Sequence, residues 1–368
     1  MVKRIGAGAA LLSLAAAATI LAVRADDGAD PPPVQSTANR GDPALNAAID
    51  ALFDDEAMGQ TRAVVVMRGG RLVAERYAPG FGPDSRLMSW SIGKSVTALL
   101  VGMMVADGRL ALDSPAPVPA WSQPGDPRGQ ITVRQLLQMT AGIDHRETAE
   151  PKAAGDTARM LFLDGAGDMA AYAENKPLAH PPGSTFSYST AATMILSDMM
   201  TRQLTASDDP AARRRAMQGF IDGRLKAPAG LASLTPEYDA AGTMIGGAFL
   251  HMTARDHARF GELLRHHGRA ASGHRIVPAQ WVDFMTTPSP RNPAYGAHLW
   301  LNRASGDSAL MPGLAPESLF GCVGHNGQYI LVSPAQRLTV VRLGMSPEPE
   351  QRDAVKAGLA RLIALLPG

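Results

Sequence analysis

The chain of 368 residues contains a single cysteine, Cys322, so no disulfide can form within it. This excludes the small secreted folds that several disulfides hold together. Lysine and arginine (35) nearly balance aspartate and glutamate (34), and a net charge of +1 excludes the broad basic surface that nucleic-acid binding usually requires. With 45% hydrophobic and only 19% charged residues, the composition also excludes a disordered chain and predicts a globular protein with a sizeable core.

The first 25 residues have the composition of an export signal. Lys3 and Arg4 precede an Ala- and Leu-rich apolar run over residues 5–23. This pattern predicts a signal peptide or an N-terminal membrane anchor over residues 1–25, because the run is long for a cleaved signal and just long enough to span a bilayer. A Pro-rich polar stretch predicts a linker over residues 26–42. We therefore expect an exported protein, periplasmic or secreted, which the run 5–23 tethers to the inner membrane if the leader is retained.

The remaining residues, 43–368, have strand signals near both ends and helical signals between them. The clearest segments are an amphipathic helix over 43–58, a hairpin over 63–77 with a Gly-Gly turn, helices over 91–106, 133–139, 188–204 and 253–267, strands at 329–332 and 338–343, and a C-terminal helix over 350–366. We therefore predict an α+β fold. An antiparallel sheet flanked by terminal helices would come from about 43–110 and 311–368, with a large helical insertion over about 111–310.

Ser91 and Lys94 stand three positions apart where a loop enters a helix, so their side chains lie on nearly the same face. A serine hydroxyl is a poor nucleophile until a base removes its proton, and a lysine can be that base only when it is neutral. The apolar run 96–104 supplies buried surroundings that would lower the pKa of Lys94. So short a pattern also arises by chance, and its weight therefore depends on the rest of the chain.

The sequence around this pair, residues 88–97 (MSWSIGKSVT), resembles the active-serine segment of the class C β-lactamase-like family of serine hydrolases. Further segments resemble later parts of that family in the same order: 136–143 (LLQMTAGI), 182–190 (PGSTFSYST), 246–247 (GG) with 253–256 (TARD), and 324–328 (GHNGQ). The resemblance covers roughly residues 45–365. It implies the β-lactamase/transpeptidase fold, and it points to the branch of 6-aminohexanoate-oligomer hydrolases and esterases.

The resemblance also implies a role for each matching residue. Ser91 would be the nucleophile, Lys94 its hydrogen-bonded partner, and Tyr188 a shared acid/base that a neighbouring lysine cation makes more acidic. The backbone N–H groups of Ser91 and Gln328 would form the oxyanion hole. Which of Lys94 and Tyr188 takes the first proton stays open. No cofactor is implied, because every role belongs to a side chain or a backbone group of the chain.

Two positions depart from the penicillin-recognising members of the family. His325 stands in place of the lysine of their Lys-Thr-Gly motif, and a histidine is a weaker anchor for an anion. Thr190 stands in place of an amide-bearing Asn. Both changes disfavour β-lactam hydrolysis and favour a small-molecule ester or linear amide as substrate. We expect Thr190, His325, Asn326 and Gly327 to bind that substrate.

Three functions follow from these patterns. The favoured one is an exported serine hydrolase that cleaves an ester or a linear amide through an acyl-enzyme. The first alternative is a D-amino-acid peptidase or a weak β-lactamase or penicillin-binding protein, and the second is a non-catalytic domain that binds cell-wall fragments. No zinc-protease motif or other ligand spacing predicts a metal site. Two pairs remain ambiguous: Asp144 and His145 could line the cleft or form a turn, and Tyr295 and Trp300 could form a substrate wall or pack in the core.

Overall fold

The computed structural model describes residues 35–36, 42–306 and 308–368. The predicted leader (1–25), its apolar run and nearly all of the predicted linker lie outside these residues. Along the part of the chain that is described, no helix is both long and apolar enough to cross a membrane.

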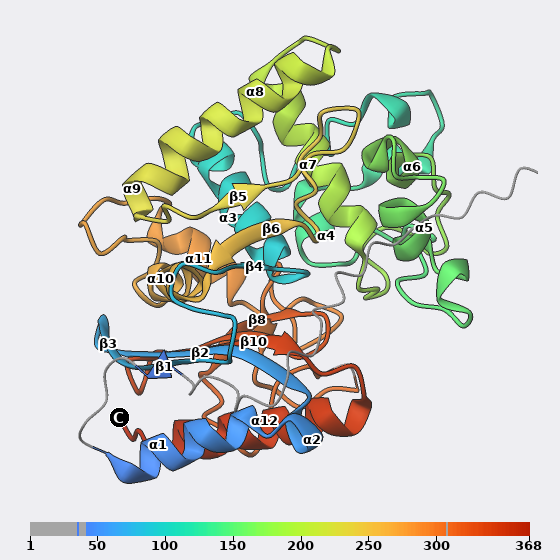
Figure 1. Cartoon of the computed structure of the whole chain (residues 1–368). Helices are drawn as coiled ribbons and strands as arrows, with labels where there is room; N and C mark the ends of the chain where they lie inside the picture. Colours follow the sequence, from blue (N-terminus) through green and yellow to red (C-terminus); the bar gives the residue numbers. More distant parts are fainter. Residues whose placement is uncertain (1–34, 37–41, 307) are drawn as a thin grey trace, which may run out of the picture. The chain divides into compact units, whose positions relative to one another are not determined.

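A seven-stranded antiparallel sheet, in the order β1-β3-β2-β10-β9-β8-β7, forms one layer of the fold (Figure 1). Its central pair joins distant parts of the chain, because β2 (Gln60–Arg68) lies beside β10 (Leu338–Met345) with Val65 opposite Val341. The other strands are β1 (Gln35–Ser36), β3 (Arg71–Tyr77), β7 (Trp300–Leu301), β8 (Phe320–Gly324) and β9 (Gln328–Ser333). The predicted antiparallel sheet with strands from both ends of the body is thus confirmed.

The predicted hairpin is formed by β2 and β3. Gly69 and Gly70 join the two strands with φ of +58° and +80°, a region that residues with a Cβ atom enter only at a cost. The run of β-branched residues in β2 reflects burial on both faces of the sheet, since Val64 and Val65 are both 0% exposed and belong to different cores.

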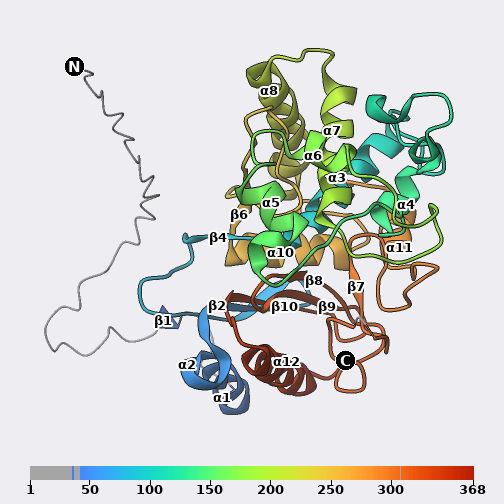
Figure 2. The same ribbon diagram turned by 90° about the vertical axis from the view of Figure 1, so that its right-hand side faces the viewer.

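Helices α1 (Pro43–Asp50) and α12 (Pro349–Ala364) cover one face of the sheet, as Figures 1 and 2 show. Apolar residues of both helices and of the facing strands form one core, which includes Leu45, Ile49, Leu52, Val64, Val66, Val340, Val355, Leu359 and Ile363. The predicted terminal helices therefore bury one apolar face of the sheet.

The segment 43–58 is not the single helix that its apolar stripe predicts. After α1 the chain makes a 3-10 turn, η1 (Ala51–Phe53), and then begins a new helix, α2 (Asp55–Met58). Asp54 separates the two: its backbone is extended (φ −74°, ψ 101°), and its carboxylate accepts two backbone N–H groups at the start of α2. A carboxylate that caps a new helix offers the backbone an alternative to continuing the old one.

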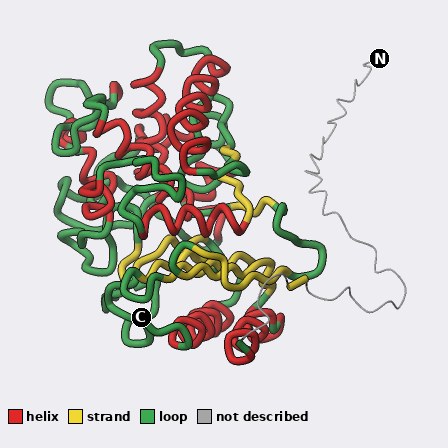
Figure 3. The backbone as a smooth tube through the Cα atoms, turned by 90° about the vertical axis from the view of Figure 1, so that its left-hand side faces the viewer, coloured by secondary structure: helices red, strands yellow, loops and turns green. Residues whose placement is uncertain are grey.

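Helix α10 (Ala254–Arg265) packs on the opposite face of the sheet (Figure 3). Its Gly261 permits this close approach, because a Cβ atom there would lie 2.6 Å from the Thr339 side chain. Thr253 caps the helix by accepting the backbone N–H of Asp256 (3.2 Å). Although α10 and β7 fall within the predicted helical insertion, both belong to the layers of the sheet.

Helix α3 (Ile92–Ala106) runs through the middle of the remaining, mostly helical region, and its residues from Ile92 to Met104 are buried on every side. This explains why its sequence is apolar all round rather than amphipathic. The elements around it are the helices α4 (Val133–Leu137), α5 (Asp156–Phe162), α6 (Met169–Glu174), α7 (Thr190–Leu204), α8 (Pro210–Ile221), α9 (Ala227–Ala229) and α11 (Ala279–Met285), the turns η2 (Pro119–Trp121), η3 (Pro127–Gln130) and η4 (Lys152–Ala154), the π-helical turn η5 (Asp222–Lys226), and a sheet of β4 (Arg86–Met88), β6 (Leu250–Thr253) and β5 (Thr235–Pro236).

Candidate active site

Ser91 lies at the turn from β4 into α3 and faces a cavity. Trp90, immediately before it, has φ +46°, an unusual backbone conformation for a bulky residue and one that is concentrated at functional sites. The buried Ser89 supports this turn: its hydroxyl donates to the carbonyl oxygen of Ala248 (3.1 Å) and accepts the N–H of Leu250 (3.2 Å). The protein thus holds the backbone on either side of Ser91 in a fixed, strained turn.

Lys94 is only 1% exposed, and its ammonium group has three hydrogen-bond partners. The Nζ atom lies 3.0 Å from Ser91 Oγ, 2.8 Å from Thr190 Oγ1 and 2.9 Å from the carbonyl oxygen of Gly247. Burial lowers the pKa of Lys94 to about 8, and the nearby Glu147 carboxylate acts in the opposite direction. The pair that the sequence singled out is therefore in contact, and its lysine can lose a proton close to neutral pH.

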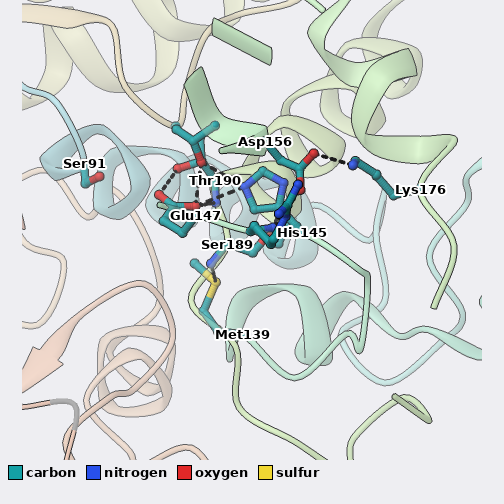
Figure 4. Close-up of polar contacts among 12 residues, drawn as sticks. Ser91, Met139, His145, Glu147, Asp156, Lys176, Ser189 and Thr190 are labelled. Atoms are coloured by element: carbon teal, nitrogen blue, oxygen red, sulfur yellow. Dashed lines mark hydrogen bonds and ion pairs between the residues drawn. The ribbon is translucent and has the colours of Figure 1, made fainter. Parts of the chain in front are cut away.

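Glu147 continues this chain of contacts beyond Thr190 (Figure 4), although it belongs to none of the motifs found in the sequence. Thr190 donates to it twice, from Oγ1 to Oε1 (2.6 Å) and from the backbone N–H to Oε2 (2.7 Å). Thr157 Oγ1 (2.9 Å) and His145 Nε2 (3.1 Å) also contact Oε2. Although burial acts to raise it, these hydrogen bonds and the Lys94 cation hold the pKa of Glu147 down at about 2. Glu147 is therefore an anion beside the lysine.

The loop that carries Glu147 is fixed by Asp156 at the start of α5 (Figure 4). The Asp156 carboxylate accepts the backbone N–H of Arg146 (2.8 Å) and the hydroxyl of Tyr172 (2.8 Å), and it pairs with Lys176. Because these contacts join residues that are 10 to 20 positions apart, no local sequence pattern predicts them. Of the ambiguous pair Asp144 and His145, Asp144 is exposed, and the buried His145 contacts the cavity-lining Glu147.

Tyr188 precedes α7 and lies within a group of aromatic rings. Its ring stacks on Trp300 (centroids 5.6 Å apart, planes at 26°) and meets Tyr295 edge-on (5.9 Å). Trp300 also lines the cavity, whereas Tyr295 is 1% exposed and belongs to the core. Tyr295 therefore packs in the core, whereas the role of Trp300 as part of a substrate wall stays a prediction.

The expectation that a lysine cation makes Tyr188 more acidic is wrong. Burial, followed by the negative charge of Glu147, raises the pKa of Tyr188 above its ordinary value, and only its hydrogen bond with Ser91 acts to lower it. The Lys94 ammonium lies over the face of the tyrosine ring, 5.1 Å from its centroid. The cation is thus directed at the ring face, and Tyr188 is a neutral phenol at physiological pH.

The segment 139–142 holds the loop that carries Tyr188. The Met139 carbonyl accepts the N–H of Ser187 (2.9 Å), and the Gly142 carbonyl accepts the N–H of His180 (3.1 Å). Gly142 has φ +78°, and a Cβ atom there would lie 2.2 Å from the carbonyl oxygen of His180. The Met-Thr-Ala-Gly stretch noted in the sequence therefore acts through the backbone, as a support for the tyrosine loop.

Gly142→Ala is expected to destabilise the protein by about 2 kcal/mol or more, because the new methyl group clashes with backbone and the residue keeps a left-handed conformation. Chemical denaturation measures this directly. Gly219→Ala is the matched control: Gly219 is exposed in α8 with open space around it, so the alanine should be neutral or stabilise by up to about 1 kcal/mol. Equal stability of the two variants would contradict the supporting role of Gly142.

The cavity beside Ser91 has a volume of about 490 Å³ and mostly apolar walls. The apolar side chains lining it include Trp90, Leu161, Phe162, Trp300 and Val323. Its polar groups include Ser91, Glu147, Tyr188, Thr190 and His325. A cavity of this size with a few convergent polar groups suits a small organic molecule. Among the residues that the structure describes, no three His, Cys, Asp or Glu side chains are grouped as metal ligands.

His325 is the residue of the 325–328 segment that reaches this cavity. It is exposed, its ring lies edge-on to Trp90 (5.3 Å), and burial of part of the imidazole together with nearby cations lowers its pKa. Asn326 and Gly327 form the turn from β8 to β9 with φ of +58° and +77°, and they line a neighbouring groove. The three residues predicted to bind substrate here thus divide between the cavity and the groove.

Two other predicted residues have protein partners that the sequence did not indicate. Gln328 is 4% exposed, pairs with Gly324 in the β8–β9 ladder and donates from its side chain to the carbonyl of Met88 (3.2 Å). The Thr190 hydroxyl, expected to contact substrate, is held between Lys94 and Glu147. The lone Cys322 is 1% exposed, and burial raises the pKa of its thiol to about 12, so it does not compete with Ser91 as a nucleophile.

This fold, with a serine and a buried lysine in contact at the end of an apolar cavity, is that of the serine hydrolases related to β-lactamases. The family model described as Beta-lactamase matches residues 53–365, and the chain belongs to that family. A 6-aminohexanoate-dimer hydrolase of Paenarthrobacter ureafaciens is 25% identical over 308 residues, which cover 79% of this chain and 74% of the relative.

Solved structures agree with this assignment of the fold. A Bacillus anthracis protein provisionally named as a 6-aminohexanoate-dimer hydrolase has a TM-score of 0.68 at 21% identity, over 87% of this chain and 83% of its own. A family VIII carboxylesterase has a TM-score of 0.62 at 16% identity, over 89% of this chain and the whole of its own. The resemblance and the α+β fold predicted from the sequence are confirmed, and the protein is a hydrolase of the serine type.

Proposed function

We propose that the protein is an exported serine hydrolase that cleaves an ester or a linear amide through an acyl-enzyme on Ser91, with Lys94 and Tyr188 as acid and base. The observation that carries the proposal is the contact of Ser91 Oγ with a buried lysine whose pKa is about 8. The names of the similar proteins, an amide hydrolase and a carboxylesterase, support the two substrate classes. The presence of nucleophile and base together argues against a non-catalytic binding domain.

The partners of Lys94 favour this residue as the first base. The carbonyl oxygen of Gly247 can only accept a hydrogen bond, and the Thr190 hydroxyl has its own proton committed to Glu147. Both atoms therefore require an N–H from Lys94. A neutral amine has two N–H groups, so its lone pair is left in the third direction, toward Ser91 Oγ. Deprotonated Lys94 is thus oriented to take the serine proton.

Tyr188 then suits the second proton transfer. Because its pKa is raised, it is a neutral phenol that can donate to the leaving group, and it lines the cavity together with Ser91. For the oxyanion hole we propose the backbone N–H of Ser91, at the start of α3, together with an N–H of the β8–β9 turn, where Gln328 is the predicted donor.

A fluorophosphonate probe tests the central step of the proposal. Intact-mass spectrometry should show one adduct per chain, and peptide mapping should place it on Ser91. Activity should then appear with short-chain p-nitrophenyl esters or with linear ω-amino amides, and it should be weaker with nitrocefin. An unlabelled protein, or an adduct on another residue, would remove the basis of the proposal. Labelling by fluorescent penicillin with turnover of D-Ala peptides would favour the peptidase alternative.

The pH dependence of hydrolysis should follow the protonation state of Lys94. Since its pKa is lowered to about 8, only about a tenth of the molecules carry a neutral lysine at pH 7, and this fraction rises with pH. We therefore expect kcat/KM for a neutral ester to increase along a limb with an apparent pKa near 8 and to level off above it. A profile that is flat between pH 6 and 9, after correction for spontaneous hydrolysis, would argue against a neutral lysine as the base.

Glu147→Gln should move that limb to lower pH. The Glu147 anion raises the pKa of Lys94, so its loss should shift the apparent pKa down by about one unit. The glutamine amide also cannot accept both Thr190 hydrogens as the carboxylate does, so the plateau rate should fall about tenfold. Asp144→Asn removes an exposed carboxylate from the same loop and should leave both quantities unchanged. An unshifted limb in Glu147→Gln would show that Glu147 has no influence on the lysine.

A further inference from the structure

A separate cavity lies in the helical region, between α6, α7 and the start of α8 (Figure 1). Helix α7 packs against both of the other helices. The cavity has a volume of about 260 Å³ and shares no lining residue with the cavity beside Ser91. It is therefore a distinct site, and its size suits a molecule smaller than most drug-sized ligands.

The walls of this cavity carry an excess of negative charge. Four carboxylates line it, and the guanidinium groups of Arg202 and Arg213 both pair with one of them, Asp198. The other three carboxylates have no ion-pair partner among the residues that the structure describes: Asp168, Glu174 and Asp208. Asp168 and Asp208 are exposed, whereas Glu174 is buried, so the negative charge extends from the protein surface to the inner wall of the cavity.

Glu174 lacks a partner although it is buried. It is 6% exposed, and its Oε1 atom has no hydrogen-bond partner among the described residues. Trp121 Nε1 (2.9 Å) and Arg128 Nη1 (3.0 Å) donate to its backbone carbonyl, which fixes the residue without satisfying the carboxylate. A buried carboxylate oxygen without a donor is costly, and it marks a place for a donor that the chain does not supply.

The surroundings of Glu174 also disfavour its ionised form. Burial, followed by the negative charge of Asp198, raises its pKa well above the ordinary value of a glutamate, and Arg202 acts in the opposite direction. The charged groups that surround it come from α6, α7, the segment 205–209, α8 and η3: Asp168, Asp198, Arg202, Asp208, Arg213 and Arg128. A cation bound beside Glu174 would therefore displace a proton from it near neutral pH.

The geometry favours an organic cation over a metal ion. The ligands of a metal ion must converge on one point at about 2.0–2.6 Å, and no three His, Cys, Asp or Glu side chains in the described part of the chain are grouped in that way. A primary ammonium group instead has three N–H donors, which point in different directions and suit carboxylates that lie further apart.

We propose that this cavity binds a small primary amine, whose ammonium group donates to Glu174 Oε1 while its short alkyl chain lies against Ala170 and Ala171. The two exposed carboxylates attract the amine to the cavity, and Glu174 supplies the buried acceptor. The inference does not depend on the proposed hydrolase function, because the site shares no residue with the cavity beside Ser91.

Calorimetric titrations of the full chain with n-butylamine, 1-butanol and butyrate test the site. The amine should bind saturably with one molecule per chain, and the neutral alcohol and the anion should not. Glu174→Gln keeps the shape of the side chain and removes its charge, so it should weaken amine binding tenfold or more. Asp208→Asn changes only an exposed carboxylate and should weaken it about threefold. Glu56→Gln, which removes an exposed carboxylate of α2, should bind the amine as the unmodified protein does.

Proton release identifies Glu174 as the carboxylate that receives the amine. Titrations at pH 7 in phosphate and in HEPES, whose ionisation enthalpies differ, should show release of up to about one proton per bound amine from the unmodified protein and none from Glu174→Gln. Equal release from both proteins would overturn the assignment.

Two other results would overturn the proposal. One is n-butylamine binding that does not saturate, or that 1-butanol matches. The other is equal affinity of the unmodified protein, Glu174→Gln and Asp208→Asn, which would place the amine elsewhere, for example beside Glu147. Asp208→Asn, an exposed substitution, keeps the test valid if Glu174→Gln proves unstable. None of these results bears on the labelling of Ser91, so the site and the hydrolase function stand or fall separately.

Discussion

Ser91→Ala should abolish hydrolysis, with kcat/KM for the best ester falling by about 10⁴-fold or more. The reason is that the proposed acyl-enzyme forms on Ser91 Oγ, and the other hydroxyl in contact with Lys94, that of Thr190, is buried and donates its proton to Glu147. Removal of the nucleophile from comparable catalytic sets leaves only the rate that substrate binding and the oxyanion hole provide. Initial rates with p-nitrophenyl esters measure the effect.

The control for this substitution is Ser122→Ala. Ser122 is exposed after η2, and its hydroxyl donates only to the carbonyl of Pro119 (2.7 Å), so the rate should not change. The fluorophosphonate adduct should disappear from Ser91→Ala and persist in Ser122→Ala. Residual activity of Ser91→Ala at a tenth of the original rate, in protein free of contamination, would mean that another residue or a water molecule attacks the substrate.

The sequence predicted the parts of this site that lie close together along the chain. Ser91 and Lys94 are three positions apart at the start of a helix, so helical geometry alone brings them together. The hairpin and the terminal helices were likewise visible in local periodicity and in the Gly-Gly turn. The prediction of one continuous helix over residues 43–58 was wrong, because the side chain of Asp54 caps a new helix there.

Such local patterns predict neither the contacts of Glu147 nor the pKa of Tyr188. Glu147 acts on Lys94 through Thr190, which is 43 positions away along the chain, and nothing local marks it as a partner. The pKa of Tyr188 depends on which part of its ring faces the lysine and on its burial, and both are properties of the folded protein. The resemblance included Tyr188 but not Glu147, and for both residues the direction of the pKa shift depends on tertiary structure.

Lys94→Met should separate catalysis from stability most sharply. The ammonium is 1% exposed, and methionine fills a similar volume without a charge. Hydrolysis should fall by about 10³-fold or more, because the proposed base of Ser91 is removed. The melting temperature should stay the same or rise, because relief of the desolvation cost offsets the donors lost to Thr190 and Gly247. Lys226→Met, on η5 and 3.8 Å from Asp222, should leave activity unchanged.

Lys94→Arg distinguishes a base from a mere cation at this position. A guanidinium keeps the positive charge and can still donate hydrogen bonds, but it does not lose its proton at accessible pH. If Lys94 takes the serine proton, Lys94→Arg should be as inactive as Lys94→Met, and the limb near pH 8 should vanish from any residual activity. If Lys94→Arg instead keeps most of the rate, the lysine serves as a fixed charge, and Tyr188 would have to be the base despite its raised pKa. Because the orientation of the Lys94 lone pair depends on Thr190 and Gly247 accepting its two N–H groups, the inactive outcome is the one that the geometry favours.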